Sequence, residues 1–478
     1  MRGGVNDTIC AVATAAGEGG VGIVRLSGTD AVEIAGGLAH LRCRKPLASV
    51  RSHTLYLADL VFRSSPATLK PIQQTIDSPA QAFDEALVVV MRGPRSFTGE
   101  DTVEFHCHGG PLILQLLCEA LVAAGGRLAE PGEFTKRAFL NGRMDLAQAE
   151  AVLDTIRAKT AGSLRLAQAQ RRGLLSREIE AVRNELVGAL AHVEAGLDFA
   201  EEDIAFVQRD DLIILLERAT RRVSALLQTA REGRIWREGA AVAIVGRPNV
   251  GKSSLMNALA RTDRAIVTAI PGTTRDVVDE WLRINDVPVR LLDTAGIRDT
   301  EDPVEQEGIR RTRRAVEDAD LVIALIDQSV ALEEADRTLL RSLCKKDSIV
   351  ALNKSDLPSG LQDDACLAGF LDGRSSVRIS ASTGGGLDDL RALIRTKLVS
   401  GGLEAGDGLC VTHLRHSLSL RRTEEALLQA RTALENELTG EFVAADLRRA
   451  ADALGEITGA ISTDDILDRI FSEFCIGK

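Results

Sequence analysis

One glycine-rich stretch in the middle of the chain constrains the fold most. Residues 246–253 read GRPNVGKS and fit the pattern G-x-x-x-x-G-K-[ST]. The apolar run 241–245 precedes them as a predicted strand, and residues 254–260 follow as a predicted helix. In that context backbone N–H groups of the loop and of the helix N-terminus point at phosphates, whereas an ordinary Gly-rich turn is the alternative. The pattern predicts a phosphate-binding loop in which Lys252 reaches the β- and γ-phosphates and Ser253 ligates Mg²⁺.

Three more short apolar runs accompany this loop, at residues 289–292, 321–326 and 349–352. Nearly continuous runs of this kind suit parallel strands that are buried on both faces. They alternate with helical patterns. The sequence therefore predicts a doubly wound α/β domain over residues 239–399.

Three polar elements follow the loop in the order that guanine-nucleotide binding requires. Residues 293–296 (DTAG) end a predicted strand and bring a carboxylate toward the metal and a glycine toward the γ-phosphate. Residues 353–356 (NKSD) end another strand, and Asp356 accepts two hydrogen bonds from guanine N1 and N2. Facing adenine, an unpaired buried carboxylate would cost on the order of several kcal/mol. Residues 380–382 (SAS) offer a backbone N–H to guanine O6. These elements resemble those of the translation-factor-related GTPases and predict GTP binding and hydrolysis.

Two catalytic devices common in GTPases have no obvious counterpart. Ile297 stands where many members carry the water-orienting Gln. No arginine is clearly placed as a finger, a device worth about 10³–10⁵ in rate. The amide oxygen of Asn249 is a candidate ligand for a monovalent cation beside the β–γ bridge, with a simple loop-tying role as the alternative. Residues 268–276 (TAIPGTTRD) form a switch-like loop whose carbonyls would complete that shell, and Thr274 would give Mg²⁺ its second hydroxyl.

The flanking regions predict two further kinds of domain. The first 140 residues mix short β-rich runs, turns and one helix, which predicts an α+β domain with strands at 7–14, 20–26, 86–91 and 102–106 and a helix at 111–124. Residues 64–81 are rich in Ser, Pro and Gln and are predicted to be a surface insertion, to which we assign no function.

Helical periodicity dominates residues 145–234 and returns at about 416–475. It breaks near residues 197–204, where an acidic cluster suits a helix start. Two helical segments flanking an α/β segment suggest one helical domain with a second domain inserted into it. The predicted domains are 1–140 (α+β), 141–238 (helical), 239–399 (G domain) and 400–478 (helical).

Composition excludes several classes of protein. A formal net charge of −11 argues against a generally basic nucleic-acid-binding surface. Eight cysteines without regular spacing or a C-x-x-C pair make neither a disulfide framework nor a zinc ribbon. A signal-peptide pattern and an 18-residue apolar run are both missing. We expect a reduced, cytoplasmic protein that does not enter membranes.

The flanking motifs are specific, and with them the chain resembles the MnmE (TrmE) family of tRNA modification GTPases from end to end. These motifs lie at 20–28 (GVGIVRLSG), 96–101 (SFTGED), 108–110 (HGG), 131–143 (PGEFTKRAFLNGR), 145–150 (DLAQAE) and 474–478 (FCIGK). The resemblance implies a tetrahydrofolate-binding N-terminal domain that dimerises, a helical domain and an inserted G domain. It also implies work with the FAD-dependent flavoprotein MnmG, as a heterotetramer, on the wobble uridine of certain tRNAs. The modification is an aminomethyl or carboxymethylaminomethyl group at C5, and 5,10-methylene- or 5-formyl-tetrahydrofolate carries the one-carbon unit.

The resemblance also implies roles for individual residues. GTP hydrolysis in the family depends on K⁺ and on two G domains meeting across the dimer. The implied K⁺ contacts are Asn249, Thr268, Ile270 and Thr273, and the Mg²⁺ ligands are Ser253 and Thr274. Glu305 is the implied general base, acting through a bridging water, and Cys475 is a second catalytic candidate. The implied folate contacts are Arg25, Glu104, Arg143 and Lys478. The GTP-binding set is Asn249, Val250, Gly251, Lys252, Ser253, Ser254, Thr268, Ala269, Ile270, Pro271, Gly272, Thr273, Thr274, Asp293, Thr294, Ala295, Gly296, Asn353, Lys354, Asp356, Ser380, Ala381 and Ser382.

Plainer interpretations stand beside several of these roles. Glu305 lies in an acidic stretch that is typical of a solvated loop. Arg25 also suits an ordinary surface ion pair, and Cys475 suits a small buried apolar group. His106 and His108 are compatible with a metal site, but alternation along a strand explains them.

The rival function is a nucleotide-gated ribosome-assembly or signalling switch. The folate-type N-terminal domain and the FCIGK tail argue against it. Equal, slow turnover in KCl and NaCl would favour it.

Overall fold

The computed structural model describes residues 7–62, 82–198, 208–263, 280–292, 315–344, 346–361, 365–371, 374–399 and 409–478. The chain forms two compact units. Unit 1 comprises Met1–Leu153 with Thr458–Lys478, and unit 2 comprises Asp154–Ile457. The predicted multidomain α/β and α+β architecture is confirmed, whereas the domain boundaries drawn from the sequence remain a prediction.

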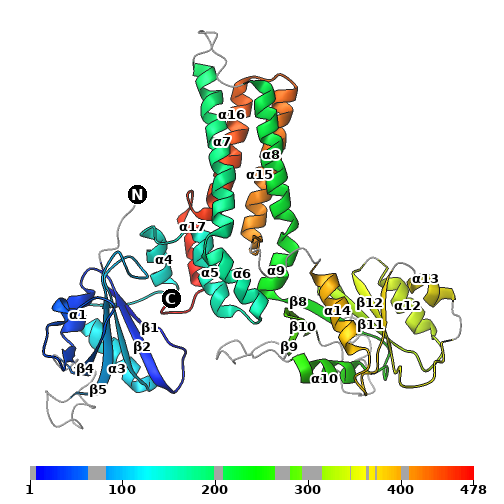
Figure 1. The fold of residues 1–478 in the computed structure, drawn as a ribbon, viewed down its shortest axis with the longest axis horizontal. Helices are drawn as coiled ribbons and strands as arrows, with labels where there is room; N and C mark the ends of the chain where they lie inside the picture. Colours follow the sequence, from blue (N-terminus) through cyan, green and yellow to red (C-terminus); the bar gives the residue numbers. More distant parts are fainter. Residues whose placement is uncertain are drawn as a thin grey trace, which may run out of the picture. The chain divides into compact units, whose positions relative to one another are not determined.

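Unit 1 is built on a seven-stranded sheet of order β3-β4-β5-β6-β2-β1-β7 (Figure 1). Every neighbouring pair is antiparallel except β1 with β7. The strands are β1 (Ile9–Val12), β2 (Gly19–Ser27), β3 (Ala39–Leu41), β4 (Leu55–Leu60), β5 (Asp84–Met91), β6 (Thr102–Gly109) and β7 (Arg127–Leu128). The four predicted strands and the predicted helix are present. Strands β3, β4 and β7 were not predicted, and β3 and β7, with three and two residues, are too short to carry a periodic signal.

Two helices and a 3₁₀ turn pack on one face of this sheet, and α4 (Glu133–Leu140) packs on part of the other. The helices are α1 (Ala31–Gly36), α3 (Pro111–Ala123) and the 3₁₀ turn η1 (Leu47–Ser49). Inward-facing residues of β2, β5 and β6, such as Val24, Val88 and Phe105, pack against them in one core. Because side chains alternate along a strand, the residues adjacent to these in sequence point to the opposite face. That opposite face carries Arg25 and Glu104.

The segment after the sheet packs with residues from the end of the chain. Helices α4 (Glu133–Leu140), α5 (Leu146–Arg157) and α17 (Asp464–Ser472) follow in chain order. Leu146, Leu153, Phe471 and Phe474 share a small apolar core in unit 1. Gly132 adopts φ of +68°, and a Cβ there would lie 2.6 Å from the Phe471 carbonyl oxygen. The close approach of residues 471–474 to α4 therefore requires glycine.

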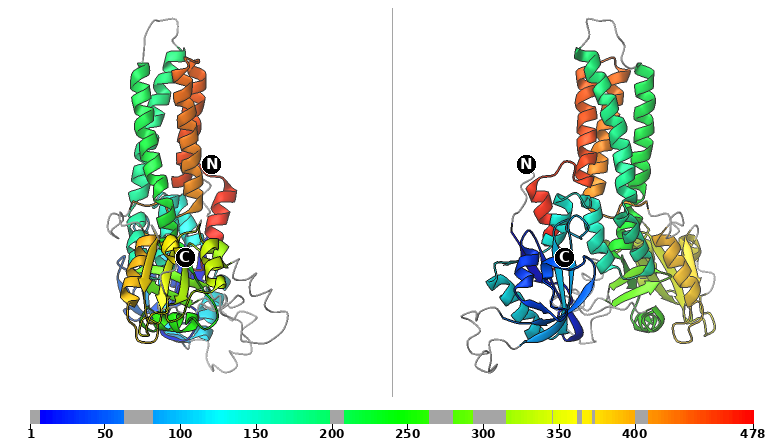
Figure 2. Two further views of the ribbon diagram at one scale, coloured as in Figure 1. Left: turned by 90° about the vertical axis from the view of Figure 1, so that its right-hand side faces the viewer. Right: turned by 60° about the vertical axis from the view of Figure 1, so that its left-hand side comes forward.

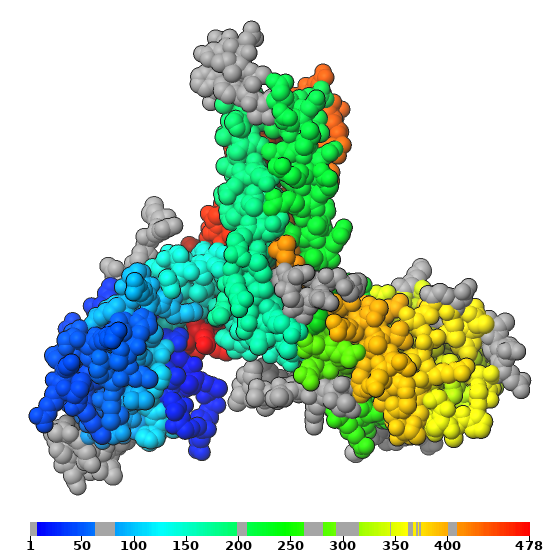
Figure 3. Space-filling view, in the orientation of Figure 1, coloured from blue at the N-terminus to red at the C-terminus, as the bar shows by residue number. Residues whose placement is uncertain are grey.

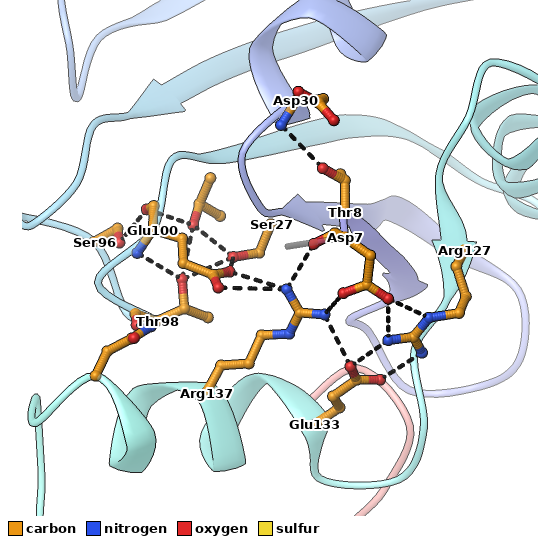
Figure 4. Close-up of polar contacts among 12 residues, drawn as sticks. Asp7, Thr8, Ser27, Asp30, Ser96, Thr98, Glu100, Arg127, Glu133 and Arg137 are labelled. Atoms are coloured by element: carbon orange, nitrogen blue, oxygen red, sulfur yellow. Dashed lines mark hydrogen bonds and ion pairs between the residues drawn. The ribbon is translucent and has the colours of Figure 1, made fainter. Parts of the chain in front are cut away.

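A buried arginine ties α4 to the sheet (Figure 4). The Arg137 guanidinium is 3% exposed and donates to Asp7, Glu100 and Glu133. Glu100 in turn accepts from the Ser27 hydroxyl at 2.8 Å. A buried cation needs such partners because desolvation is costly. The network gives residues of the 96–101 and 131–143 motifs a structural role.

The helical part of unit 2 has one core that is shared by two distant segments. Its helices are α6 (Ala161–Arg171), α7 (Leu174–Asp198), α8 (Arg209–Gln228), α9 (Ala230–Glu238), α15 (Leu414–Glu435) and α16 (Gly440–Thr458). Figure 2 shows α7, α8, α15 and α16 running alongside one another, and α7 and α8 lie side by side on the surface in Figure 3. Leu186, Leu216, Leu427 and Leu454 belong to the common core. The α/β segment is thus inserted between two halves of one helical bundle.

The inserted segment is a six-stranded sheet of order β13-β12-β11-β8-β10-β9. Its strands are β8 (Ala240–Val245), β9 (Glu280–Ile284), β10 (Val287–Leu292), β11 (Leu321–Asp327), β12 (Ser348–Asn353) and β13 (Ser375–Arg378). All neighbours are parallel except β9 with β10. The described helices are α10 (Lys252–Asp263), α12 (Glu334–Ser342), α13 (Ala365–Leu371) and α14 (Leu387–Leu398). Apolar clusters on both faces make it doubly wound, as predicted, while the edge strands β9 and β13 were missed.

Candidate functional site: a nucleotide pocket and a second polar cluster

The glycine-rich loop joins β8 directly to α10. Asn249 and Gly251 have φ of +62° and +102°, and this left-handed backbone turns the chain sharply before the helix. A Cβ at Gly246 would lie 2.4 Å from the Leu325 carbonyl oxygen, so the loop begins in contact with β11. Ser253 and Ser254 are exposed in the first turn of α10, whereas Val250 is buried. Backbone N–H groups at such a helix start suit an anionic ligand.

Lys252 folds back over the loop that precedes it. Its Nζ donates to the carbonyl oxygens of Gly246 and Arg247, at 2.8 Å each. Burial lowers the pKa of this ammonium. The lysine is thereby held within the loop that was predicted to bind phosphates.

Asn353 links the loop to the predicted guanine-recognition elements. Its Nδ2 donates to the Val250 carbonyl oxygen at 2.7 Å, and its Oδ1 accepts from the Ala381 backbone N–H at 3.0 Å. A Cβ at Gly251 would lie 2.3 Å from the same Nδ2. One buried amide therefore sets the separation of residues 246–251 from residues 380–382.

Asp356 lies beside the serine loop. Its Oδ1 accepts from the Ser380 hydroxyl at 2.6 Å, and Ser380 and Ser382 share a hydrogen bond of 3.0 Å. The hydrogen bond from Ser380 lowers the pKa of Asp356. The carboxylate is therefore ionised near neutral pH and able to accept hydrogen bonds from a base.

Two anchoring pairs were not found from the sequence. Lys354 has φ of +62°, and its Nζ lies 2.5 Å from Asp327, a mostly buried residue at the end of β11. Burial acts to raise the pKa of Asp327, but hydrogen bonds from Lys354 and Ser329 lower it overall. Arg247 donates through Nε to the buried Asp336 of α12 at 2.8 Å. No motif pairs these residues, because each pair joins elements that are far apart in the sequence.

Several predicted site residues lie outside the described residues. They are Thr268, Ala269, Ile270, Pro271, Gly272, Thr273, Thr274, Asp293, Thr294, Ala295, Gly296 and Glu305. Their assigned roles stay predictions. Of the predicted metal ligands, the described ones are Ser253 and Asn249, both exposed at the loop. A hydroxyl and an amide oxygen are hard donors that fit Mg²⁺ and K⁺.

A second polar cluster lies on the face of the unit 1 sheet opposite α1 and α3, where Phe134 of α4 packs against Ile9 and Ala11. Arg25 on β2 donates through Nε to Glu104 on β6 at 2.8 Å, and the side chains are only 16% and 14% exposed. The Arg25 guanidinium also lies 5.8 Å from the Phe97 ring and 5.7 Å from the Phe134 ring. Burial opposes ionisation of Glu104, but Arg25 and His106 lower its pKa overall. This is a sheltered pair, not the surface pair considered as the alternative.

Residues 475–478 reach the same cluster. Burial lowers the pKa of the Lys478 ammonium, and the nearby Arg25 charge lowers it further, while Glu104 and Cys475 act to raise it. Gly477 has φ of +93°, and a Cβ there would lie 2.2 Å from the Val12 carbonyl oxygen. The structure thus brings Lys478 to Arg25 and Glu104, which are far away in the sequence.

The remaining candidates of unit 1 fall around this cluster. Arg143 is exposed and donates through Nε to the Ser96 carbonyl oxygen at 3.1 Å, in the motif that carries Phe97. Cys475 is exposed, which rules out the buried interpretation. In contrast, burial raises the pKa of the Cys10 thiol to about 11.

The two histidines of β6 are held by carboxylates. His106 Nε2 lies 3.2 Å from Glu104, and His108 Nδ1 lies 2.6 Å from Asp84. Within the described part of the chain, groups of three or more His, Cys, Asp or Glu side chains suited to a metal ion do not occur. Among the same residues, the helices are too short or too polar to cross a membrane.

A phosphate loop after a central parallel strand, joined by one asparagine to an Asp- and Ser-lined base pocket, defines a P-loop GTPase. Residues 8–143 match the family model of the GTP-binding protein TrmE N-terminus, and residues 146–475 match that of the MnmE helical domain. The chain belongs to the MnmE family of tRNA modification GTPases.

Curated relatives match 99% of this chain. The tRNA modification GTPase MnmE of Geobacter sulfurreducens is 46% identical over 477 residues, which is 99% of this chain and 100% of the relative. That of Heliobacterium modesticaldum is 45% identical over 480 residues, with the same two coverages. Among solved structures, the G domain of the T. maritima FeoB iron transporter matches 33% of this chain and 96% of its own. Its sequence identity is 28% and its TM-score 0.25, too low to support an argument. The chain is a GTP hydrolase that acts in tRNA modification.

Proposed function

We propose that the chain uses K⁺-dependent GTP hydrolysis to drive modification of the wobble uridine of certain tRNAs together with the flavoprotein MnmG. The product carries an aminomethyl or carboxymethylaminomethyl group at C5, and a tetrahydrofolate bound to unit 1 supplies the one-carbon unit. The observation that carries the proposal is the convergence of Arg25, Glu104 and Lys478 at a sheltered place on the sheet. A GTPase acting as a simple switch has no need of such a cluster.

The chemistry of the cluster fits a folate. The glutamate tail of a folate carries carboxylates, and its pterin carries amino groups. Arg25, Lys478 and the exposed Arg143 would bind the carboxylates, with Arg25 oriented between two aromatic rings. Glu104 would accept from the pterin amino groups in exchange for its present partners. Cys475 is an accessible thiol near this place and is a candidate for the uridine chemistry.

Potassium would supply the charge that an arginine finger supplies elsewhere. Asn249 stands exposed on the phosphate loop, where its amide oxygen would be a K⁺ ligand. Because Ile297 cannot orient water, Glu305 would act as general base through a bridging water. Ser253 would hold Mg²⁺, which neutralises phosphate charge when bound.

An apolar strip on unit 1 supports a homodimer. Leu55, Leu57 and Leu87 are 51%, 37% and 41% exposed at the β4–β5 end of the sheet face opposite α1 and α3. Leu57 stands directly opposite Leu87 in the β4–β5 register, so the strip is continuous. Val21 on β2 is 60% exposed. Contiguous apolar surface of this kind is typical of interaction sites, and a second copy of this chain would cover it in the cytoplasm.

The decisive experiment is a mass-spectrometric analysis of wobble uridines in tRNA from cells that lack this protein. Complementation with the wild-type chain should restore the C5 group, and complementation with Arg25→Ala should not. Arg42→Ala, which removes an exposed arginine of the same domain, is the matched control and should behave as wild type. Unmodified uridine in wild-type complemented cells would refute the proposal. GTP turnover in KCl against NaCl tests the cation, and equal rates would refute K⁺ dependence.

A further inference from the structure

The β9–β10 hairpin of the G domain is packed directly on the helical bundle. At its turn, Asp286 accepts from Arg165 of α6 at 2.9 Å. Gly162, one turn earlier on α6, leaves no room for a side chain, because a Cβ would lie 2.4 Å from the Trp236 ring and 3.0 Å from the Asp286 carboxylate. Figure 1 shows α6 and α9 next to this end of the sheet. The hairpin turn is therefore held by helices outside the G domain.

The two parts also share an apolar core. Ile235 and Trp236 of α9 are buried in the same cluster as Leu282 of β9 and Val289 of β10, and Leu166 of α6 packs against it. Buried side chains in one close-packed cluster move together, because interiors tolerate little change in volume. A displacement of the hairpin would thus act on α6 and α9.

Trp281 of β9 also takes part in this contact between the hairpin and the helices. Gly239, which ends α9 with φ of +86°, would place a Cβ 2.4 Å from the Trp281 ring. The Lys159 ammonium, between α5 and α6, lies over the same ring, 2.7 Å from its centroid. Next to these residues is a cavity of about 410 Å³ that both tryptophans line. A cation on an indole face is an attractive contact that depends on geometry.

The hairpin lies in the sequence between the two segments that are predicted to face the γ-phosphate and Mg²⁺. Strand β9 begins at Glu280, six positions after Thr274 of the predicted switch-like loop 268–276. Strand β10 ends at Leu292, directly before the predicted metal-facing Asp293. It also pairs with β8, which leads into the phosphate loop. Both segments expected to sense the γ-phosphate are therefore covalently continuous with a hairpin that rests on the helical bundle.

We propose that the β9–β10 hairpin transmits the nucleotide state of the G domain to the helical domain, with Trp281–Lys159 and Asp286–Arg165 as the positioning contacts. The proposal deepens the proposed function, because it names the element through which GTP hydrolysis would drive tRNA modification. None of the four side chains was assigned to GTP, metal or folate.

The same interface contains a natural control. Arg231 of α9 donates to Asp347 at 2.7 Å, just before β12. This ion pair also joins the helical and G domains, but it is far in sequence from the segments that carry the predicted switch residues. This ion pair should hold the G domain to the helical domain without responding to which nucleotide is bound.

The first experiment uses intrinsic fluorescence, because the chain has two tryptophans and both line this contact. Full-length protein in KCl and Mg²⁺ should give different emission spectra when saturated with GDP and with a non-hydrolysable GTP analogue. Trp281→Phe should lose most of that difference, and Lys159→Met should reduce it by at least half. Binding of both nucleotides is checked separately by equilibrium dialysis. Identical wild-type spectra in the two bound states would overturn the proposal.

The second experiment measures coupling, as tRNA modified per GTP hydrolysed with the flavoprotein present. Asp286→Asn should keep GTP turnover within about twofold of wild type and lower the coupling ratio about tenfold or more. Asp347→Asn should leave the ratio unchanged, and the exchange Asp286→Arg with Arg165→Asp should restore a large part of it. An Asp286→Asn ratio equal to that of wild type would overturn the proposal. If the wild-type protein does not modify tRNA at all, the proposed function is refuted. The fluorescence comparison would then still test whether the hairpin transmits the nucleotide state to the helical domain.

Discussion

The side-chain amide of Asn353 donates a hydrogen bond of 2.7 Å to the Val250 carbonyl oxygen. The residue is 2% exposed, and its other amide atom is satisfied by the Ala381 backbone. Asn353, the first residue of the NKSD element, therefore links the base pocket to the phosphate loop by hydrogen bonds. It positions two binding loops whether or not it also contacts the nucleotide.

Asn353→Ala should weaken GTP and GDP binding by about tenfold or more, since leaving two buried partners unsatisfied costs roughly 1–3 kcal/mol. Titration with a fluorescent guanine nucleotide measures this directly. Ser355→Ala, in the same element but with no assigned contact, is the control. An Asn353→Ala variant with wild-type affinity would show that the loops are set by other contacts.

Asp356→Asn should shift base preference from guanine toward xanthine, because an amide can donate where the carboxylate only accepts. Competition between GTP and XTP for binding gives the selectivity ratio. The ordering by Ser380 is retained, since an amide oxygen still accepts its hydroxyl. Unchanged selectivity would refute the contact assigned to Asp356.

Glu305→Ala should leave nucleotide affinity nearly intact and lower the rate of GTP hydrolysis by orders of magnitude, because a general base acts in the transition state. Single-turnover kinetics in KCl measure the chemical step. Glu301→Ala, a neighbour in the same acidic stretch, should hydrolyse GTP normally. A parallel loss of affinity and rate would make Glu305 structural.

Gly477→Ala should displace Lys478 from Arg25 and Glu104, because the added Cβ meets the Val12 carbonyl oxygen at 2.2 Å in a left-handed backbone. We expect weaker tetrahydrofolate binding and lost wobble-uridine modification with GTP turnover preserved. Ile476→Ala, which truncates a side chain that is 60% exposed, is the control. Calorimetric measurement of folate affinity tests this prediction. An affinity equal to that of the wild type would show that residues 475–478 do not contribute to the folate site.

Glu104 should make the protein sensitive to acid. Its pKa is lowered in the folded state, so it stabilises the fold above the ordinary glutamate pKa of about 4.3. That contribution is lost as the pH falls from there through the lowered folded pKa. Urea unfolding from pH 7 to pH 3 should therefore show a gap in stability between wild type and Glu104→Gln that closes in the acid range. A gap that stays constant with pH would contradict the ionised Arg25–Glu104 pair.

The sequence by itself determined the elements whose signal is local. The loop at 246–253 follows its strand and precedes its helix without a gap in the sequence. Strands β8, β10, β11 and β12 are nearly continuous apolar runs, because both of their faces are buried. The order of the NKSD and SAS elements was enough to predict guanine as the base, because hydrogen-bond chemistry is a property of residue type.

Only the tertiary structure decided which distant residues meet. The ion pairs Lys354–Asp327 and Arg247–Asp336 each join elements that lie far apart in the chain, which no local pattern encodes. Arg25, Glu104 and Lys478 were grouped only through the family resemblance, and the structure places Lys478 near the other two. The edge strand β9 also escaped prediction, although it carries the contact between the G domain and the helical bundle. Its alternating burial is set by what packs on each side, and burial against a partner segment is a property of the folded chain.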